Sequence, residues 1–245
     1  MRTYKLTIAY DGSRYQGWQR QPSTDLTIQG TLEKMISGIL GYDVEVQGSG
    51  RTDGGVHAKG QTASIVLRGK IEEAQFLSEC AKRLPEDICI WKIELVKNGF
   101  HARHSARGKC YVYTVDTREK ADVFSRKYTG HYPGELDVSA MGKAAGILVG
   151  THDFAGFTDR KDEKSTIRRI YDIMIECQGE KVVITYRGSG FMYHMVRILT
   201  GTLLEVGSGM RSIESVGAAL ESKVRADAGF LAPASGLTLR EVYYH

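Results

Sequence analysis

The stretch Gly48-Ser-Gly-Arg-Thr-Asp-Gly-Gly-Val-His-Ala58 is the most informative part of this 245-residue chain. It places one carboxylate, Asp53, two residues after Arg51 and directly before a Gly-Gly pair. Glycines allow positive φ and close approach of backbone and ligand, and a guanidinium offers a planar fork for phosphate or carboxylate. Asp-Gly is also a common turn signal. The segment alone therefore fits a surface turn as well as a functional loop.

The composition is that of a globular protein. Hydrophobic residues make up 42% of the chain and charged residues 25%, which argues against disorder, and the length allows one large domain or two small ones. The net charge of +4 permits a polyanionic partner without requiring one. Basic residues form three clusters: Arg103, Arg107 and Lys109; Arg126 and Lys127; and Arg160, Lys161, Lys164, Arg168 and Arg169. Such clusters can neutralise phosphates, although each alone is more typical of a solvated surface.

The sequence lacks the motifs that mark several functional classes. The four cysteines are far apart and no signal peptide is seen, which predicts reduced thiols in a cytoplasmic protein. No apolar run approaches the roughly 20 residues that cross a bilayer, the seven histidines show no zinc-like spacing, and no Gly-x-x-x-x-Gly-Lys-Ser/Thr loop occurs. We therefore expect no membrane span, no metal and no nucleotide cofactor.

Hydrophobic periodicity predicts an α+β fold with mainly antiparallel sheets covered by helices. The expected strands are 3–10, 44–47, 61–68, 88–96, 110–116, 170–177, 182–187 and 241–244, and the expected helices are 28–39, 72–84, 137–150, 191–206 and 212–221. Residues 170–177 and 182–187 are predicted to form a hairpin. The basic, turn-rich segment 102–108 suggests a boundary near Arg107, with domains at 1–107 and 108–245.

The helix expected at 191–206 is apolar on most sides, which is typical of a buried helix. Arg197 lies off its main apolar stripe. A buried guanidinium is costly unless a carboxylate and hydrogen bonds meet it. Asp53 is our candidate for that carboxylate. Extension to solvent, or pairing with Glu205 or Asp227, remains an equal alternative at this stage.

A pair of tyrosines, Tyr111 and Tyr113, shares one face of the expected strand 110–116. Such pairs usually pack in a core or across strands. Beside a basic cluster, however, an aromatic ring also offers a platform for an unstacked base.

Taken together, the motifs resemble the tRNA pseudouridine synthase A family. The resemblance covers the Asp53 loop and, in family order, the motifs Tyr10-Asp-Gly, Gly17-Trp-Gln-Arg-Gln21, Thr27-Ile-Gln-Gly30, Phe100-His-Ala-Arg-His-Ser-Ala106, Gly150-Thr-His-Asp-Phe154, Phe191-Met-Tyr-His-Met-Val-Arg197 and Ala234-Ser-Gly-Leu237. It thus spans essentially the whole chain. Two departures are small: Gly54 stands where the family often has alanine, and Tyr15 where phenylalanine is usual.

The resemblance implies roles for individual residues. Asp53 would be the nucleophile and Arg197 its ion-pair partner. Tyr111 would stack on the target uracil, Arg51 would enter the anticodon stem, and His57 and Arg103 would also contact substrate. The reaction would convert uridine to pseudouridine at tRNA positions 38, 39 and 40 without a cofactor. Two α+β domains of the pseudouridine synthase fold would meet at a basic cleft, and the enzyme would act as a homodimer.

Two other functions compete with this one. A non-catalytic RNA-binding protein would explain the basic and aromatic residues but not an aspartate paired with a buried arginine. A carboxylate-dependent nucleoside or glycoside hydrolase would typically use two catalytic carboxylates, whereas the Asp53 loop contains one.

Overall fold

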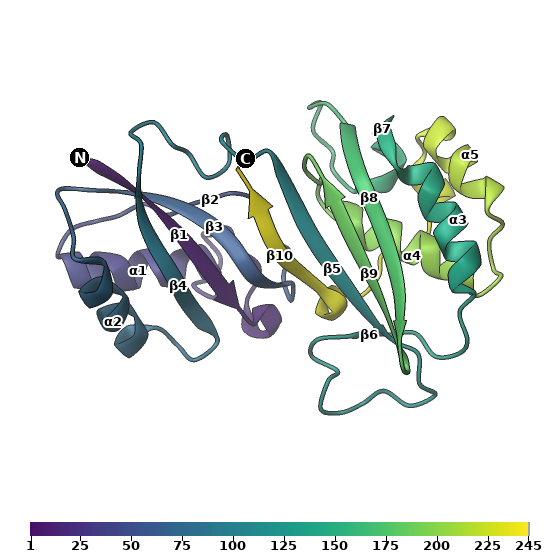
Figure 1. The fold of residues 1–245 in the computed structure, drawn as a ribbon, viewed down its shortest axis with the longest axis horizontal. Coiled ribbons are helices and arrows are strands. Elements are labelled where there is room, and N and C mark those ends of the chain that lie inside the picture. The colour runs from purple at the N-terminus through teal and green to yellow at the C-terminus, as the bar shows by residue number, and fades with distance from the viewer. Residues whose placement is uncertain (245) are drawn as a thin grey trace. The chain divides into compact units, whose positions relative to one another are not determined.

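The computed structural model describes residues 1–244 and divides them into two compact units. The first unit comprises Met1–Arg107 together with the chain from Leu239 onward, and the second comprises Gly108–Thr238. Each unit combines helices with a mostly antiparallel sheet (Figure 1). The α+β class predicted from periodicity is therefore confirmed.

The first unit has a sheet in the order β4-β1-β3-β10, with the short β2 paired to β3. Its elements are β1 (Arg2–Tyr10), the 3-10 helix η1 (Gly12–Arg14), α1 (Ile28–Leu40), β2 (Gln47–Gly48), β3 (His57–Leu67), α2 (Glu73–Arg83), β4 (Ile88–Val96) and β10 (Leu237–Tyr243).

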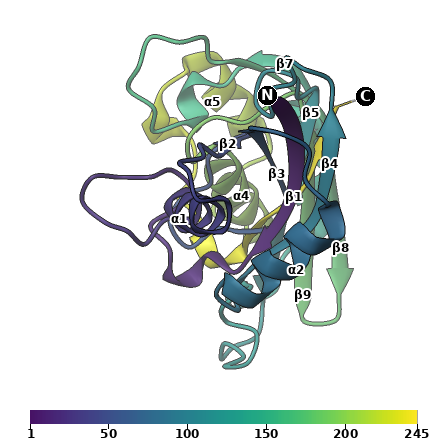
Figure 2. The same cartoon turned by 90° about the vertical axis from the view of Figure 1, so that its left-hand side faces the viewer.

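Alternation in β1 buries one of its faces. Tyr4, Leu6, Ile8 and Tyr10 are all at most 4% exposed, as the sequence pattern predicted. The helices α1 and α2 contact one another and lie along the sheet (Figure 2). Thr27 caps the start of α1 by accepting a hydrogen bond from the Gly30 backbone N–H, and Gly41 ends it at φ +73°. The expected helix thus forms with its expected end.

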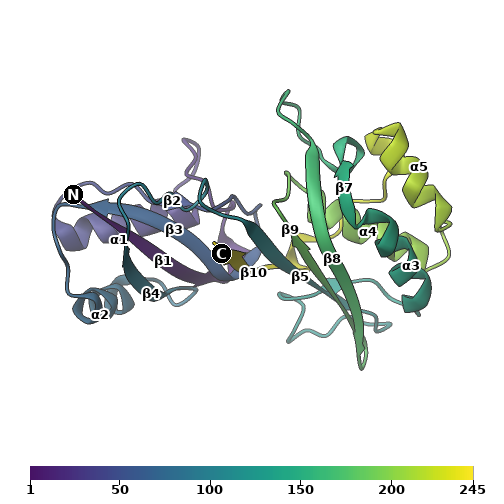
Figure 3. The ribbon, with the colours of Figure 1, turned by 45° about the horizontal axis from the view of Figure 1, so that its top comes forward.

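The second unit has a sheet in the order β5-β9-β8-β7, with β6 parallel to β5. Its elements are β5 (Gly108–Asp116), β6 (Gly130–His131), α3 (Val138–Leu148), β7 (Gly150–Asp153), η2 (Ala155–Phe157), β8 (Ile167–Gln178), β9 (Lys181–Gly188), α4 (Met195–Gly207), α5 (Glu214–Ser222), η3 (Arg225–Asp227) and η4 (Ala234–Gly236). The helices α3, α4 and α5 group together on one side of β8 and β9 (Figure 3). The predicted β8–β9 hairpin is confirmed.

Several element boundaries differ from the prediction. The helix expected from Phe191 begins at Met195, because His194 adopts the left-handed conformation at φ +62° and ends the irregular segment before it. The strand expected at 44–47 is reduced to Gln47–Gly48. The short strands β6 and β7 were not predicted, since two to four residues carry too little periodicity to detect.

Candidate active site

The Asp53 loop, residues 48–58, connects β2 to β3 in the first unit, where Asp53 is half-buried. Three backbone hydrogen bonds hold this loop in place. Trp18 N–H donates to Thr52 O at 3.0 Å, Gly55 N–H to Tyr15 O at 3.3 Å, and Val56 N–H to Asp53 O at 3.2 Å. The aspartate is therefore fixed against the segment 15–18 rather than lying on a free surface turn.

Gly17 allows this close packing of two backbones. It adopts φ +100°, and a Cβ at this position would lie 2.7 Å from Thr52 O and 3.2 Å from the Asp53 carbonyl carbon. A side chain there would push directly on the Asp53 loop. Gly54 is different, since a Cβ would meet only Tyr15 O and Gln16 at ordinary distances of 3.5–3.6 Å. An alanine at that position, as the family often has, is compatible with this backbone.

A buried polar network supports the loop from below. The Tyr10 hydroxyl lies 2.8 Å from Thr52 Oγ1, Gln61 Nε2 donates to Gly50 O at 3.1 Å, and Ser49 Oγ donates to Gln61 Oε1 at 2.7 Å. Burial raises the pKa of Tyr10 to about 12, against the opposing hydrogen bonds from Thr52 and Gln61. This network was not predicted from the sequence. Its one visible signal is a polar residue, Gln61, that is followed in β3 by the apolar Ala63, Ile65 and Leu67 on the same alternation.

His57 lies beneath the loop and is only 3% exposed. Its Nδ1 accepts a hydrogen bond from Gly12 N–H at 3.1 Å and lies 3.2 Å from Asp11 Oδ1. The ring thus ties the start of β3 to the turn after β1. Its predicted contact with substrate stays a prediction.

Arg51 and Arg103, far apart in the sequence, line the same cavity of about 260 Å³. Both side chains are exposed. Arg51 Nε donates to Gln19 Oε1 at 3.0 Å, and the cavity wall also includes Trp18 and His101. Trp18 is only 2% exposed, so its indole forms part of the cavity wall, whereas the two exposed guanidinium groups are suited to phosphate contacts. The fold therefore brings together two of the residues that the resemblance marked as substrate contacts.

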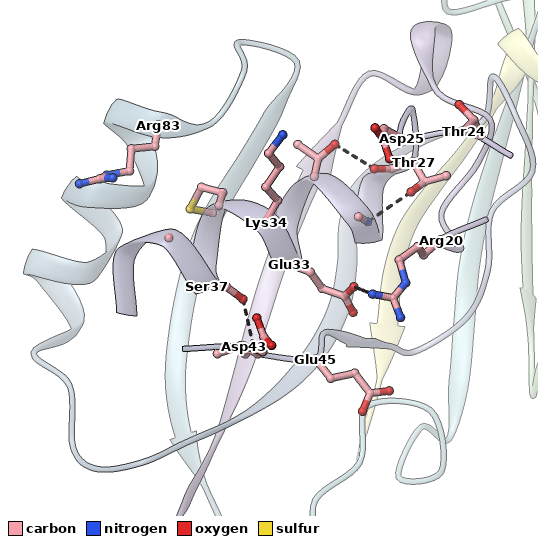
Figure 4. Close-up of a pocket in the computed structure, with 15 residues that line it drawn as sticks. Arg20, Thr24, Asp25, Thr27, Glu33, Lys34, Ser37, Asp43, Glu45 and Arg83 are labelled. Atoms are coloured by element: carbon pink, nitrogen blue, oxygen red, sulfur yellow. Dashed lines mark hydrogen bonds and ion pairs between the residues drawn. The ribbon is translucent and has the colours of Figure 1, made fainter. Parts of the chain in front are cut away.

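A larger cavity of about 1200 Å³ lies beside α1 and contains none of the predicted site residues (Figure 4). Arg20 Nη1 lies 3.2 Å from Glu33 Oε2 across it. Its other charged side chains are Asp25, Lys34, Asp43, Glu45 and Arg83. Because acids and bases are interspersed, this cavity offers no net attraction for a polyanion.

In the second unit, Tyr111 lies on β5 and is 7% exposed. Its ring packs edge-on against Phe191, with ring centroids 5.4 Å apart. Tyr113, on the same strand face, is fully buried and donates its hydroxyl hydrogen bond to Pro233 O at 2.9 Å. Burial raises the pKa of Tyr113, and the positive charge of Arg197 opposes that rise. Of the two tyrosines, Tyr113 is therefore a core residue, and Arg197 lies close enough to influence it.

Arg197 is one of only two residues of α4 that are not buried, the other being Glu205. Its Nε donates to Ala232 O at 2.7 Å, and Ala232 N–H donates back to Arg197 O at 3.2 Å. Glu205 pairs instead with Arg211, whose Nε lies 2.8 Å from Glu205 Oε2. The guanidinium is thus held at a fixed place on a buried helix.

The start of α4 is positioned by an ion cluster that the sequence analysis missed. His194 Nδ1 lies 2.6 Å from Asp159 Oδ2, and Arg225 Nε donates to Asp159 Oδ1 at 2.9 Å. Burial works to raise the pKa of the Asp159 carboxyl, but its bonds to His194 and Arg225 outweigh this and leave that pKa lowered. The cluster fixes the turn three residues before Arg197.

Among residues 1–244, the His, Cys, Asp and Glu side chains form no group of three or more able to hold a metal ion. Within the same range, no helix combines the length and the apolar character that crossing a bilayer requires.

The fold and site define an α+β protein with a single carboxylate on a braced glycine-rich loop, beside an arginine-lined cavity. The chain belongs to the tRNA pseudouridine synthase family, whose model matches residues 6–105 and 144–245. The first matched segment includes Arg51, Asp53, His57 and Arg103, and the second includes Arg197. Tyr111 lies between the two segments.

Curated relatives match over the full length of both chains. tRNA pseudouridine synthase A 2 of Bacillus cereus (strain ZK / E33L) is 41% identical over 245 residues. tRNA pseudouridine synthase A of Brevibacillus brevis is also 41% identical, again with 100% of each chain covered. A solved Cbf5-Nop10-Gar1 complex matches 96% of this chain and 47% of that chain at 13% identity and a TM-score of 0.36, a likeness too low to carry any argument.

Proposed function

We propose that this protein isomerises uridine to pseudouridine at positions 38, 39 and 40 of the tRNA anticodon stem-loop. Membership of the tRNA pseudouridine synthase family supports the reaction. The observation that carries the assignment of residues is the Asp53 loop, in which a half-buried aspartate is held by three backbone hydrogen bonds and a polar network. A nucleophile needs this fixed geometry.

Asp53 acts as the nucleophile in this proposal. The bond between N1 of uracil and C1′ of ribose breaks, the base turns, and a bond between C5 and C1′ replaces it, while C5 loses its proton to solvent and N1 gains one. The carboxylate holds one fragment covalently while the base reorients, by attack on either C6 or C1′, and then leaves as a carboxylate. One proton is released and one is taken up, and no electron is transferred, so the product is an isomer of the substrate and no redox partner is needed.

Residues of the second domain complete the proposed site. The first domain, 1–107, supplies Asp53, and the second, beginning at residue 108, supplies Tyr111 and Arg197, with the two meeting at a basic cleft. Arg197 pairs with Asp53 and orients its carboxylate. Tyr111 stacks on the extruded uracil, and its edge-on contact with Phe191 sets the orientation of its ring.

Arg51 and Arg103 are proposed to hold the RNA. A uridine inside a stem must be flipped out before it reacts, at a cost of a few kcal/mol. Guanidinium contacts to phosphate and to the vacated stack offset that cost, and the shared cavity of Arg51 and Arg103 supports their joint action. His57 holds the Asp53 loop in place and contributes to substrate binding. We further propose that a homodimer binds each tRNA in the cytoplasm.

Asp53→Asn tests the nucleophile directly. We expect tRNA affinity and the unfolding midpoint to stay near wild type, while release of tritium from C5-labelled uridine in tRNA falls by about 10⁴-fold or more. Asp25→Asn, which changes an exposed carboxylate of the larger cavity, serves as the matched control and should keep full activity. Retained tritium release in Asp53→Asn would exclude the assignment, and free uracil among the products would indicate hydrolysis instead.

A further inference from the structure

The loop of residues 117–128, between β5 and β6, carries the most exposed aromatic ring among the described residues 1–244. Phe124 is 91% exposed, and the neighbouring Val123 is 66% exposed. Arg126 and Lys127, the second basic cluster of the sequence, follow directly and are exposed as well. The loop projects from the end of β5 (Figure 1). It lies outside both segments that the family model matches, and nothing in the proposed reaction uses it.

A buried carboxylate anchors the loop at its base. Asp116 is 0% exposed and accepts hydrogen bonds from Arg118 Nε at 2.8 Å, from Arg118 Nη2 at 2.9 Å and from the Asp122 N–H at 3.1 Å. The bidentate bond from Arg118 holds the pKa of Asp116 well below its usual range, although burial opposes this. A buried charge with this many partners fixes the backbone on both sides of it.

Asp122 then shapes the tip. It accepts hydrogen bonds from Phe124 N–H at 3.0 Å and from Ser125 Oγ at 2.8 Å, and it lies 3.3 Å from Arg118 Nη2. One helical turn follows, since Arg126 N–H donates to Asp122 O at 2.8 Å. Phe124 is thus presented on a braced turn rather than on a slack loop. A pre-organised platform loses little conformational entropy when it binds.

The charges on this tip favour an anionic occupant. Residues 117–128 carry four basic and two acidic side chains. Arg118 faces Asp116, Asp122 and Glu180 at the base of the loop, whereas Arg126 and Lys127 are exposed and follow Phe124 closely in the sequence. An aromatic face next to two cations is the arrangement that binds an unpaired base together with its flanking phosphates.

We infer that the 117–128 loop is a second RNA-binding platform, on which Phe124 stacks an unpaired base of the tRNA while Arg126 and Lys127 contact neighbouring phosphates. This inference rests on the proposed function for the identity of the RNA, but it assigns no chemical step to the loop. A protein partner is less favoured, because the three exposed large apolar side chains of the loop, Val123, Phe124 and Tyr128, offer a small area and specific protein interfaces bury about 800 Å² per partner.

Substitutions at Phe124 test the stacking. With unmodified tRNA transcript as the probe, Phe124→Ala should raise Kd by about 5- to 150-fold, while turnover at saturating tRNA and the unfolding midpoint stay unchanged. Phe124→Trp should retain wild-type affinity. Phe124→Leu, the matched control that keeps apolar area but lacks a flat ring, should bind as weakly as Phe124→Ala. Arg126→Ala with Lys127→Ala should lessen the salt dependence of log Kd by about 1 per lost phosphate contact.

Three outcomes would overturn the inference: wild-type affinity in Phe124→Ala, wild-type affinity in Phe124→Leu, or a change in sedimenting mass in Phe124→Ala, which would make the loop a protein contact. Failure of the proposed function would look different. If the wild-type protein bound tRNA but formed no pseudouridine, the isomerase assignment would fall, and the Kd series would still decide the role of the loop.

Discussion

The segments that carry Asp53 and Arg197 are held in place by opposite kinds of force. Hydrogen bonds and a glycine fix the Asp53 loop, which packs its backbone against Gly17 and rests on the hydroxyl of Tyr10. Burial fixes the α4 backbone at Arg197, because every residue of α4 other than Arg197 and Glu205 is buried, and the bond from Arg197 Nε to Ala232 O positions the guanidinium. The place of Asp53 thus depends mainly on directional contacts, and that of Arg197 mainly on a packed apolar helix.

This difference predicts how each segment responds to change. Hydrogen bonds weaken steeply with distance and angle, so a displacement of a few tenths of an ångström in the loop should reach Asp53. Hydrophobic burial is non-directional, so α4 should keep its place when a side chain on its exposed side is replaced by one of similar volume. Loop variants should therefore lose stability and activity together, whereas helix-surface variants should separate the two.

Among variants that compare the two supporting segments, the largest effect is expected at Arg197. Arg197→Met keeps an unbranched apolar stem but removes the charge, so we expect kcat to fall by about 100-fold with a small change in unfolding midpoint. Arg197→Lys should recover only part of the loss, because an ammonium lacks the planar fork. For both variants, single-turnover assays measure the rate and thermal unfolding measures the midpoint.

Arg211→Met is the control for Arg197, because Arg211 pairs with Glu205 of the same helix. It should leave kcat unchanged. If Arg197→Met lowered the unfolding midpoint but not kcat, the guanidinium would serve the fold alone. That result would contradict the expected difference between loop and helix variants.

The next largest effect is expected at Gly17. Gly17→Ala would place a methyl group 2.7 Å from Thr52 O at φ +100°, and we expect it to cost about 1–3 kcal/mol of stability and to lower kcat by moving Asp53. Gly38→Ala is the control: nothing lies within 4 Å of its Cβ position in α1, so it should be neutral or stabilise by up to about 1 kcal/mol. Denaturant unfolding and kcat measure both. Equal stability of the two variants would contradict the role of Gly17.

The Asp53 loop could be recognised from sequence because its residues are contiguous. Its supports could not, because Gly17 and Gln61 reach it only through the pairing of distant segments. The shared cavity of Arg51 and Arg103 was beyond the sequence for the same reason.

The predicted start of α4 was wrong, and the reason lies in a segment distant in the sequence. Apolar periodicity continues back through Met192, so the helix was expected from Phe191. The hydrogen bond between His194 and Asp159, which lies in the segment after η2, stabilises a left-handed residue that ends this periodicity. A contact between distant segments overrode a local pattern, which no window on the sequence can report.

The smallest effect is expected at Tyr10, where the loop meets its polar network. Tyr10→Phe removes the bond to Thr52, so we expect a loss of about 1 kcal/mol near pH 8. The pKa of Tyr10 is raised from 10.0 to about 12 by burial. The neutral phenol therefore contributes stability that is fully present below pH 10 and is lost as the pH rises toward 12.

The phenylalanine variant lacks this alkaline loss, so the stability gap between it and the wild type should stay constant from pH 8 to pH 10 and narrow as the pH rises from 10 toward 12. Denaturant unfolding at about four pH values in that range would measure the gap, with Tyr171→Phe, 45% exposed, as the control for general alkaline unfolding. A gap that stayed constant with pH would show that the Tyr10 hydroxyl reaches water. The loop would then rest on backbone contacts alone, and its contrast with the apolar setting of α4 would be weaker than the static contacts indicate.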